Sequence, residues 1–281
     1  MNTRFYNARI LTMTHGFDIM QGEVWVEGNR ITYVGENKDK NEKKADWDRE
    51  INVKENLLMP GFKNAHTHSG MTLLRSYADD LPLLEWLEHQ IFPVEAKISS
   101  EDIYHLSKLA IMEYLTSGMT ANFDMYLTPD SVAQASIDFG FRTVMVGGFN
   151  NYSQSLEDLE DWYVRYNNGH ELIRFCLGFH AEYTNSIENL KGVAELSHKY
   201  HAPVFTHSSE SKAEVDGCIE RHGVTPTVLF DRLGIFEYGG GAYHCVHMSQ
   251  EDLDVFQKKG LSVVTNPGSN TKLASGIAPI S

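Results

Sequence analysis

Two histidines separated by a single residue, His66 and His68, are the first side chains in the sequence that could act together chemically. An apolar run precedes them and predicts a strand over residues 57–64. Residues two apart on a strand point to the same face, so both imidazoles should project together from its carboxyl end. Two nitrogen donors on a rigid strand end form half of a metal site. A pair of exposed loop histidines is the alternative that so short a pattern leaves open.

Histidines and a carboxylate also follow other short apolar runs. His207 ends one run and Glu210 follows it by three residues, while His244 and His247 end the next run. His207 could supply a third nitrogen to the same metal, and a carboxylate at position 210 could carry protons beside an activated water. A helix-capping glutamate in a surface turn is the alternative for Glu210. His244 is the better candidate of its pair, and His247 is as well explained as a structural histidine.

The ligand set His66, His68 and His207 offers neutral nitrogen only. Such donors suit zinc or iron(II) and do not suit magnesium. A catalytic zinc site keeps one position open for water and lowers the pKa of that water to about 7. We therefore expect one divalent cation, zinc before iron(II). His180 also follows an apolar run and could be a further ligand or a substrate contact, while the remaining histidines, such as His15, are interpreted as surface residues.

These side chains must be held by the elements that carry them. Residues 1–59 are predicted to form a small β unit with a hairpin turn at Gly28-Asn29. The charged stretch 37–50 is predicted to be a loop. From residue 60 the pattern changes to alternating strands and helices, so the predicted domains are 1–59 and 60–281.

Seven strand-like runs occur at 57–64, 120–126, 143–146, 173–180, 203–207, 241–247 and 261–265. Helical patterns lie between several of them, and the clearest, 100–117, has Ser100 as its predicted N-cap. This alternation predicts a parallel sheet with helices outside it. Polar groups end several strands, as in a (β/α)8 barrel, and the Gly-rich turn of a Rossmann sheet does not follow the first strand. We predict an α/β TIM-type barrel that lacks its last strand–helix unit, because the chain ends where an eighth strand is due.

Charge and composition narrow the range of partners. The 281 residues carry a formal net charge of −14, which disfavours binding to nucleic acid or to an anionic membrane surface. No apolar run approaches the length of a membrane span, and no signal-type segment follows Met1. Cys176, Cys218 and Cys245 form no CxxC pair and suit a reducing compartment. We expect a cytoplasmic protein that takes a small molecule, and formation of a homo-oligomer stays open.

Taken together, the motifs resemble those of the amidohydrolase superfamily. They are Pro60-Gly-Phe-x-Asn-x-His-Thr-His68, His207-x-x-Glu210, His244-Cys-Val-His247 and Asn266-Pro-x-Ser-Asn-x-Lys-Leu-Ala-Ser-Gly276. The most similar branch holds the S-adenosylhomocysteine/5'-methylthioadenosine deaminases and the triazine chlorohydrolases. Segments 91–95 and 118–126 resemble the adenosine-type deaminases in particular.

The resemblance implies a role for each residue near the metal. His66, His68 and His207 are implied to bind it. Glu210 would carry a proton from the water to a ring nitrogen of the substrate. His244 would help to hold or deprotonate the water.

Three further residues are predicted to contact the substrate. The resemblance implies that His180 contacts it and that Glu95 accepts hydrogen bonds from ribose hydroxyls. Trp86 is placed with them as an aromatic residue that lines the pocket, with a core position as the alternative. The implied ligand is a purine nucleoside or another aminated heterocycle.

The chain departs from the family pattern at three places. The family's metal-binding Asp follows the eighth strand, so the resemblance implies that this ligand is missing from an incomplete barrel. Glu182 stands where the family has Pro, which changes a loop beside the pocket. Gly147-Gly148 replaces a Thr-Arg-Gly segment of homocysteine-accepting members. That loss removes a partner for an amino-acid carboxylate and leaves smaller aminated purines or nucleosides open.

Three functions follow as hypotheses. The first is hydrolytic deamination of an adenine-type nucleoside, in which water adds to the amine-bearing ring carbon and ammonia leaves. The second keeps the nucleophile and changes the leaving group, as in guanine deamination or displacement of chloride from a triazine. The third is an inactive truncated barrel that binds a nucleoside or a partner without turnover.

Overall fold

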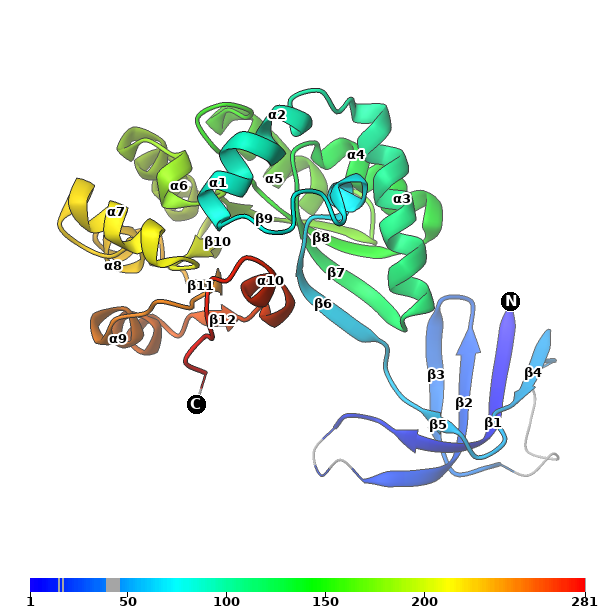
Figure 1. Ribbon diagram of the computed structural model, residues 1–281. Helices are drawn as coiled ribbons and strands as arrows, with labels where there is room; N and C mark the ends of the chain where they lie inside the picture. Colours follow the sequence, from blue (N-terminus) through cyan, green and yellow to red (C-terminus); the bar gives the residue numbers. More distant parts are fainter. Residues whose placement is uncertain (15, 17, 39–45, 281) are drawn as a thin grey trace. The chain divides into compact units, whose positions relative to one another are not determined.

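The computed structural model describes residues 1–14, 16, 18–38 and 46–280 of the chain. Contacts divide the chain into two compact units, unit 1 (Met1–Phe62) and unit 2 (Lys63–Ser281) (Figure 1). His15 and residues 39–45 of the predicted loop lie outside the described residues. The predicted end of that loop at residue 50 is wrong, because Arg49 already begins a strand.

Unit 1 is a small sheet of β1 (Asn2–Leu11), β2 (Ile19–Glu27), β3 (Arg30–Gly35), β4 (Arg49–Asn52) and β5 (Leu57–Leu58). β2 pairs antiparallel with β1 and β3, while β4 and β5 pair parallel with β1. The predicted hairpin is confirmed: Gly28 takes a left-handed φ of 61° in the turn between β2 and β3. Ala8, Ile10 and Val24 form the buried core of this unit.

Unit 2 contains a seven-stranded sheet whose strands follow one another in chain order. They are β6 (Phe62–Thr67), β7 (Met119–Met125), β8 (Arg142–Val146), β9 (Ile173–Gly178), β10 (Val204–Ser208), β11 (Gly240–His244) and β12 (Ser262–Val264). Neighbours from β7 to β12 pair in parallel, which confirms the predicted α/β class. Parallel pairing places the carboxyl ends of all these strands at the same edge of the sheet.

The sheet is rolled, as a barrel requires. β6 and β11 are five steps apart in the strand order. In a flat sheet this separation would be about 24 Å, because neighbouring strands lie about 4.8 Å apart. However, the ring of His66 at the end of β6 stacks on the ring of Tyr243 in β11 at 3.7 Å between centroids. The curl therefore brings the two distant strand ends together, and the predicted TIM-type architecture is confirmed.

Helices connect these strands and are seen around the sheet in Figure 1. The longer ones are α3 (Ser100–Thr116), α4 (Pro129–Phe139), α5 (Leu156–Asn167), α6 (Ile187–Tyr200), α7 (Lys212–His222), α8 (Pro226–Arg232), α9 (Gln250–Lys259) and α10 (Pro267–Lys272). Ser99 caps α3 instead of the predicted Ser100: its hydroxyl accepts the N–H of Asp102, whose carboxylate accepts the N–H of Ser99. None of the helices in the described ranges has the length and apolar content needed to cross a membrane.

Short helices follow β6 and were not predicted from the sequence. They are the 3₁₀-helix η2 (Ser69–Leu74), α1 (Leu83–Trp86), the π-helix η3 (Leu87–Ile91) and α2 (Phe92–Glu95). Leu83, Leu87 and Ile91 pack with Leu74 and Leu273 in a buried cluster. This cluster fixes the segment that carries Trp86 and Glu95.

Three predicted strand limits are wrong. The run 57–64 is two strands, because Pro60 lacks an N–H and the chain leaves β5 before it enters β6. The run 173–180 ends at Gly178, so His180 lies beyond the strand. The run 241–247 ends at His244, because His244 and Cys245 adopt left-handed φ angles of 70° and 50° that a strand cannot continue.

Gly147 lies where the chain leaving β8 passes close to its neighbours. A Cβ at Gly147 would lie 2.3 Å from Cδ1 of Leu159 and 2.7 Å from the carbonyl oxygen of Gly178. A Cβ at Gly148 would meet nothing nearer than Cγ of Met125 at 3.4 Å. The first glycine is therefore required by packing and the second is not.

We expect Gly147→Ala to lower the free energy of unfolding by about 1–3 kcal/mol, because the added methyl group overpacks the core. Gly148→Ala is the matched control and should stay within about 1 kcal/mol of the parent, since its methyl group has room and restricts the unfolded chain. Urea unfolding of the metal-free protein measures both values. Equal losses in the two variants would contradict the close approach at Gly147.

Candidate metal centre

Three of the predicted ligands meet at one end of the curled sheet. Ligand atoms of His66, His68 and His207 lie within 4.8 Å of one another and could hold a metal ion. His66 comes from β6, His68 follows that strand directly, and His207 comes from β10. The Nε2 atoms of His66 and His207 are 3.2 Å apart. Two nitrogens bound to one tetrahedral zinc ion at 2.0–2.1 Å would be about 3.3 Å apart, so the spacing fits a shared ion.

Backbone carbonyls orient two of these rings. Nδ1 of His68 is 2.5 Å from the carbonyl oxygen of Met125, and Nδ1 of His207 is 2.6 Å from that of His180. A carbonyl only accepts, so each Nδ1 carries the hydrogen and each Nε2 keeps its lone pair for a cation. Such second contacts are typical of histidines that bind metals.

All three rings are neutral in the folded chain. Burial lowers the pKa of His66 and of His207 well below the usual value, and the neighbouring histidines lower both further. Burial also lowers the pKa of His68, against the opposing hydrogen bond to Met125. Neutral imidazoles are the form that binds a divalent cation, so the electrostatics and the geometry of the cluster agree.

His244 lies beside the three histidines at the end of β11. Its ring centroid is 5.5 Å from that of His207 and 5.9 Å from that of His66. Its Nδ1 is 2.7 Å from Oδ1 of Asn270 and 3.3 Å from Oε1 of Glu210. Burial lowers the pKa of His244 to about 4, although the Asn270 contact opposes this shift. Because Nδ1 faces two oxygen acceptors, Nε2 is free to accept a proton.

Glu210 is buried next to His244 and follows β10 in the chain. Burial, and then the nearby carboxyl group of Glu214, raises the pKa of Glu210 to about 8. The Glu210 side chain is therefore protonated at neutral pH and can donate a hydrogen bond or a proton. Raised carboxyl pKa values of this kind are common where proton transfer takes place.

His180 reaches the same cluster from the residues after β9. Its ring centroid is 4.9 Å from that of His207, and its Nδ1 is 3.2 Å from Oγ1 of Thr184. Burial, and then the neighbouring rings of His68 and His244, lower the pKa of His180 to about 3. His180 is thus neutral, and its carbonyl group orients His207 at the same time.

Glu95 and Trp86 lie on the short helices after β6. Burial raises the pKa of Glu95 to about 7, against an opposing interaction with the Tyr126 hydroxyl. Trp86 donates its indole N–H to the carbonyl oxygen of Tyr77 at 3.2 Å, and the ammonium of Lys272 lies 5.5 Å from the Trp86 ring centroid. Glu95 therefore lies near Tyr126, which directly follows β7. The contacts of Trp86 named here lie outside the histidine cluster.

Sequence reasoning gave no role to four residues that shape the site. Tyr243 stacks on His66, and Asn270 bonds His244. Buried Asp124 accepts the N–H of Ser69 at 3.0 Å, and Glu214 lies against the Glu210 backbone. Three of them had a local signal: Asn270 stands in the motif that begins at Asn266, Asp124 stands at the end of a predicted strand, and Ser211-x-x-Glu214 has the spacing of a capping box.

Glu182, which departs from the family pattern, is held by an ion pair with Arg221 and by a contact with His222. Its carboxylate accepts the Nε–H of Arg221 at 3.1 Å and lies 3.0 Å from Nε2 of His222. Both partners end α7, so this helix ties the residues after β9 to those after β10. The buried glutamate therefore has Arg221 as the charged partner that such a position requires.

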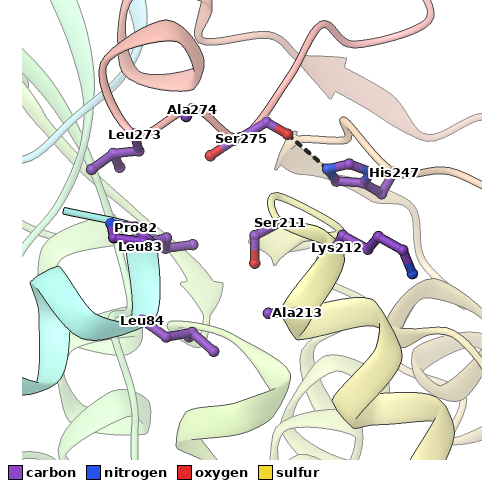
Figure 2. A pocket seen from close by; sticks show the side chains of 10 residues that line it. All are labelled: Pro82, Leu83, Leu84, Ser211, Lys212, Ala213, His247, Leu273, Ala274 and Ser275. Atoms are coloured by element: carbon purple, nitrogen blue, oxygen red, sulfur yellow. Dashed lines mark hydrogen bonds between the residues drawn. The ribbon is translucent and has the colours of Figure 1, made fainter. Parts of the chain in front are cut away.

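A cavity of about 210 Å³ lies beside the residue that follows Glu210. Figure 2 shows its walls, which come from residues 82–84, 211–213 and 273–275 and from His247. His247 turns toward one wall and its Nε2 is 2.7 Å from the carbonyl oxygen of Ser275. His247 therefore orders the chain after α10.

Comparison with known proteins agrees with the fold. The model of the amidohydrolase family matches residues 57–281. The chain therefore belongs to the amidohydrolase family.

Three similar proteins are named as deaminases. A 5-methylthioadenosine/S-adenosylhomocysteine deaminase from Thermoanaerobacter pseudethanolicus is 40% identical and matches the whole chain. A 5'-deoxyadenosine deaminase from Methanosarcina acetivorans is 39% identical over 98% of the chain. The solved adenosine deaminase from Xanthomonas campestris with bound zinc has a TM-score of 0.88 and 30% identity over 99% of the chain. This chain spans 66%, 64% and 65% of these three proteins, respectively.

Proposed function

We propose that the chain catalyses hydrolytic deamination of an adenine-type nucleoside, with zinc as its metal and iron(II) as the alternative. The observation that carries this proposal is the meeting of His66, His68 and His207 with Glu210 and His244. The names of the relatives, which are deaminases of adenine nucleosides, support the same substrate class. A cytoplasmic setting accords with three free cysteines.

In this proposal, His66, His68 and His207 hold the cation. When bound, the cation supplies Lewis-acid activation of a water molecule. The neutral Nε2 atoms of His66 and His207, 3.2 Å apart, are the donors that the chain provides for it. The carbonyl groups of Met125 and His180 keep the rings of His68 and His207 turned for binding.

Glu210 and His244 divide the proton transfers in this proposal. Nδ1 of His244 is fixed by Asn270 and Glu210, so Nε2 is the atom that takes a proton from the water. Protonated Glu210 donates to the ring nitrogen beside the reacting carbon, which makes that carbon more electrophilic. A C–O bond then forms and the C–N bond breaks. One proton of the water leaves with the amino group as ammonia, and the other replaces the proton that Glu210 gave to the ring nitrogen.

Glu95 and His180 are proposed to recognise the sugar and the base. Glu95 can accept hydrogen bonds from two adjacent hydroxyls when its carboxyl group is ionised. His180 is neutral and can accept or donate beside the three metal ligands. Trp86 is proposed to line the approach to them with its ring.

A direct test of this proposal measures the reaction itself. The zinc-loaded chain should release ammonia from adenosine, 5'-methylthioadenosine or 5'-deoxyadenosine, and Glu210→Gln should lower kcat by about 10²–10⁴-fold because the proton donor is lost. Glu188→Gln, on the exposed side of α6, is the control and should leave kcat unchanged. Ammonia release from guanine, or chloride release from a chlorinated triazine, in place of these reactions would favour another leaving group. Absence of any turnover across the panel would rule out this function for the chain.

The KM for the nucleoside should depend on pH through Glu95. The pKa of Glu95 is raised to about 7, so its carboxylate form grows as the pH rises from 6 to 8. The KM for adenosine should therefore fall by up to about tenfold over this range, following the ionised fraction of the acid. Glu95→Gln should remove this part of the pH dependence, because an amide does not titrate. An identical pH profile of KM in both proteins would contradict a role for Glu95.

A further inference from the structure

Glu214 holds the backbone of the residues that carry Glu210. The Glu214 carboxylate accepts the N–H of Ser209 at 2.9 Å and the N–H of Glu210 at 2.8 Å, one on each oxygen. The side chain is buried, with 1% of its surface exposed. Both donors belong to residues that directly follow β10, between the metal ligand His207 and the start of α7.

The same backbone also fixes the residues after β11. The carbonyl oxygen of Ser209 accepts the N–H of Val246 at 2.9 Å and that of His247 at 2.8 Å. The N–H of Cys245 donates to the carbonyl oxygen of Ser208 at 3.1 Å. Three hydrogen bonds therefore join Ser208 and Ser209 to the residues that follow β11, and Glu214 holds Ser209 through its N–H group.

The backbone at these points is in an uncommon conformation. Ser209, His244 and Cys245 have φ angles of 54°, 70° and 50°, in the left-handed region that side chains other than glycine seldom adopt. Such conformations persist only where surrounding contacts hold them. The two N–H groups bound by Glu214 are contacts of this kind, since one of them belongs to Ser209 itself.

Other helices of unit 2 show what a helix cap alone does. Asp102 and Asp158 complete capping boxes on α3 and α5, and each accepts the backbone N–H of its own cap residue. Both are exposed. Asp252 does the same on α9 and is fully buried, with the Thr225 hydroxyl as an added partner. Glu214 differs from all three. Its shortest contacts are with the N–H groups of Ser209 and Glu210, which precede its own cap residue, Ser211.

We propose that Glu214 is a positioning residue that holds the Glu210 carboxyl group against His244. It acts through the backbone of Ser209 and Glu210, and through Ser209 it also fixes the residues after β11. The role of Glu210 in proton transfer rests on the proposed function, whereas the mechanical role of Glu214 does not. Figure 2 shows that Ser211 to Ala213, the next residues, form one wall of the cavity, so this backbone also shapes that wall.

The structural half of the test is amide hydrogen exchange followed by mass spectrometry. Glu214→Gln replaces one acceptor oxygen with an NH₂ group, so it can serve only one of the two N–H donors. Exchange should rise by about tenfold or more both in residues 208–211 and in residues 245–247, because the two segments are linked. Asp252→Asn is the matched buried control and should affect the start of α9 and Thr225, its two sets of contacts, while residues 245–247 stay unchanged. Ser211→Ala removes the cap hydroxyl and keeps the Glu214 carboxylate, so it should leave residues 245–247 unchanged.

If Glu214→Gln does not fold, Glu214→Asp provides the same comparison, because its shorter side chain keeps a carboxylate in the first turn and cannot reach Ser209. Unchanged exchange in residues 245–247 of the folded variant would overturn the proposal. Exchange that rises equally in Ser211→Ala would also overturn it, since an ordinary helix cap would then explain the effect.

The catalytic half of the test is a double-mutant cycle. Glu214→Gln should lower kcat by about 10–100-fold and leave the KM for the nucleoside within about threefold, because positioning of the proton donor affects the reaction step. In a Glu210→Gln background the second substitution should change kcat by less than about twofold, since Glu214 acts through Glu210. Additive losses would overturn the positioning role. If the unsubstituted chain releases no ammonia, the proposed function fails, and the exchange measurement alone decides on Glu214.

Discussion

The site depends on the curl of the parallel sheet, which brings the carboxyl end of β6 against those of β10 and β11. Without it, His66 and Tyr243 would be about 24 Å apart instead of stacked, because five strand spacings would separate them. The curl also encloses the rings of His66 and His207, and this burial lowers the pKa of both, which favours their neutral forms. A scaffold that packs apolar residues around a rolled sheet thus produces a cluster of unprotonated nitrogen donors at its rim.

The carboxyl groups around this cluster follow the same physical rule. Glu210, Glu214 and Asp124 are buried, and burial raises the pKa of each, to about 8, 7 and 6, respectively. Each has hydrogen-bond donors or a histidine beside it, so none is buried without a partner. The groups proposed to transfer protons therefore share one environment with their supports, and the backbone after β10 connects them to His207, a proposed metal ligand.

Local patterns in the sequence were sufficient to predict the alternating strands and helices, and to single out His66, His68, His207 and Glu210 as neighbours. They were insufficient for strand ends: β11 stops at His244, where His244 and Cys245 take left-handed angles, and β9 stops at Gly178, before His180. Asn270 stands in a quoted motif, but its contact with His244 could not be predicted, since the two residues are 26 positions apart and meet only in the folded chain. The short helices after β6 were missed for a similar reason: Leu83, Leu87 and Ile91 are ordered by packing against Leu273, far along the chain.

The central claim is that His66, His68 and His207 bind one divalent cation. X-ray absorption at the zinc K-edge, on the chain loaded with stoichiometric zinc, tests it most directly. The account predicts imidazole nitrogens at about 2.0–2.1 Å, and a weaker imidazole signal in His207→Ala, because one of the donors is then lost. An oxygen-only shell, or an imidazole signal that His207→Ala leaves unchanged, would contradict it.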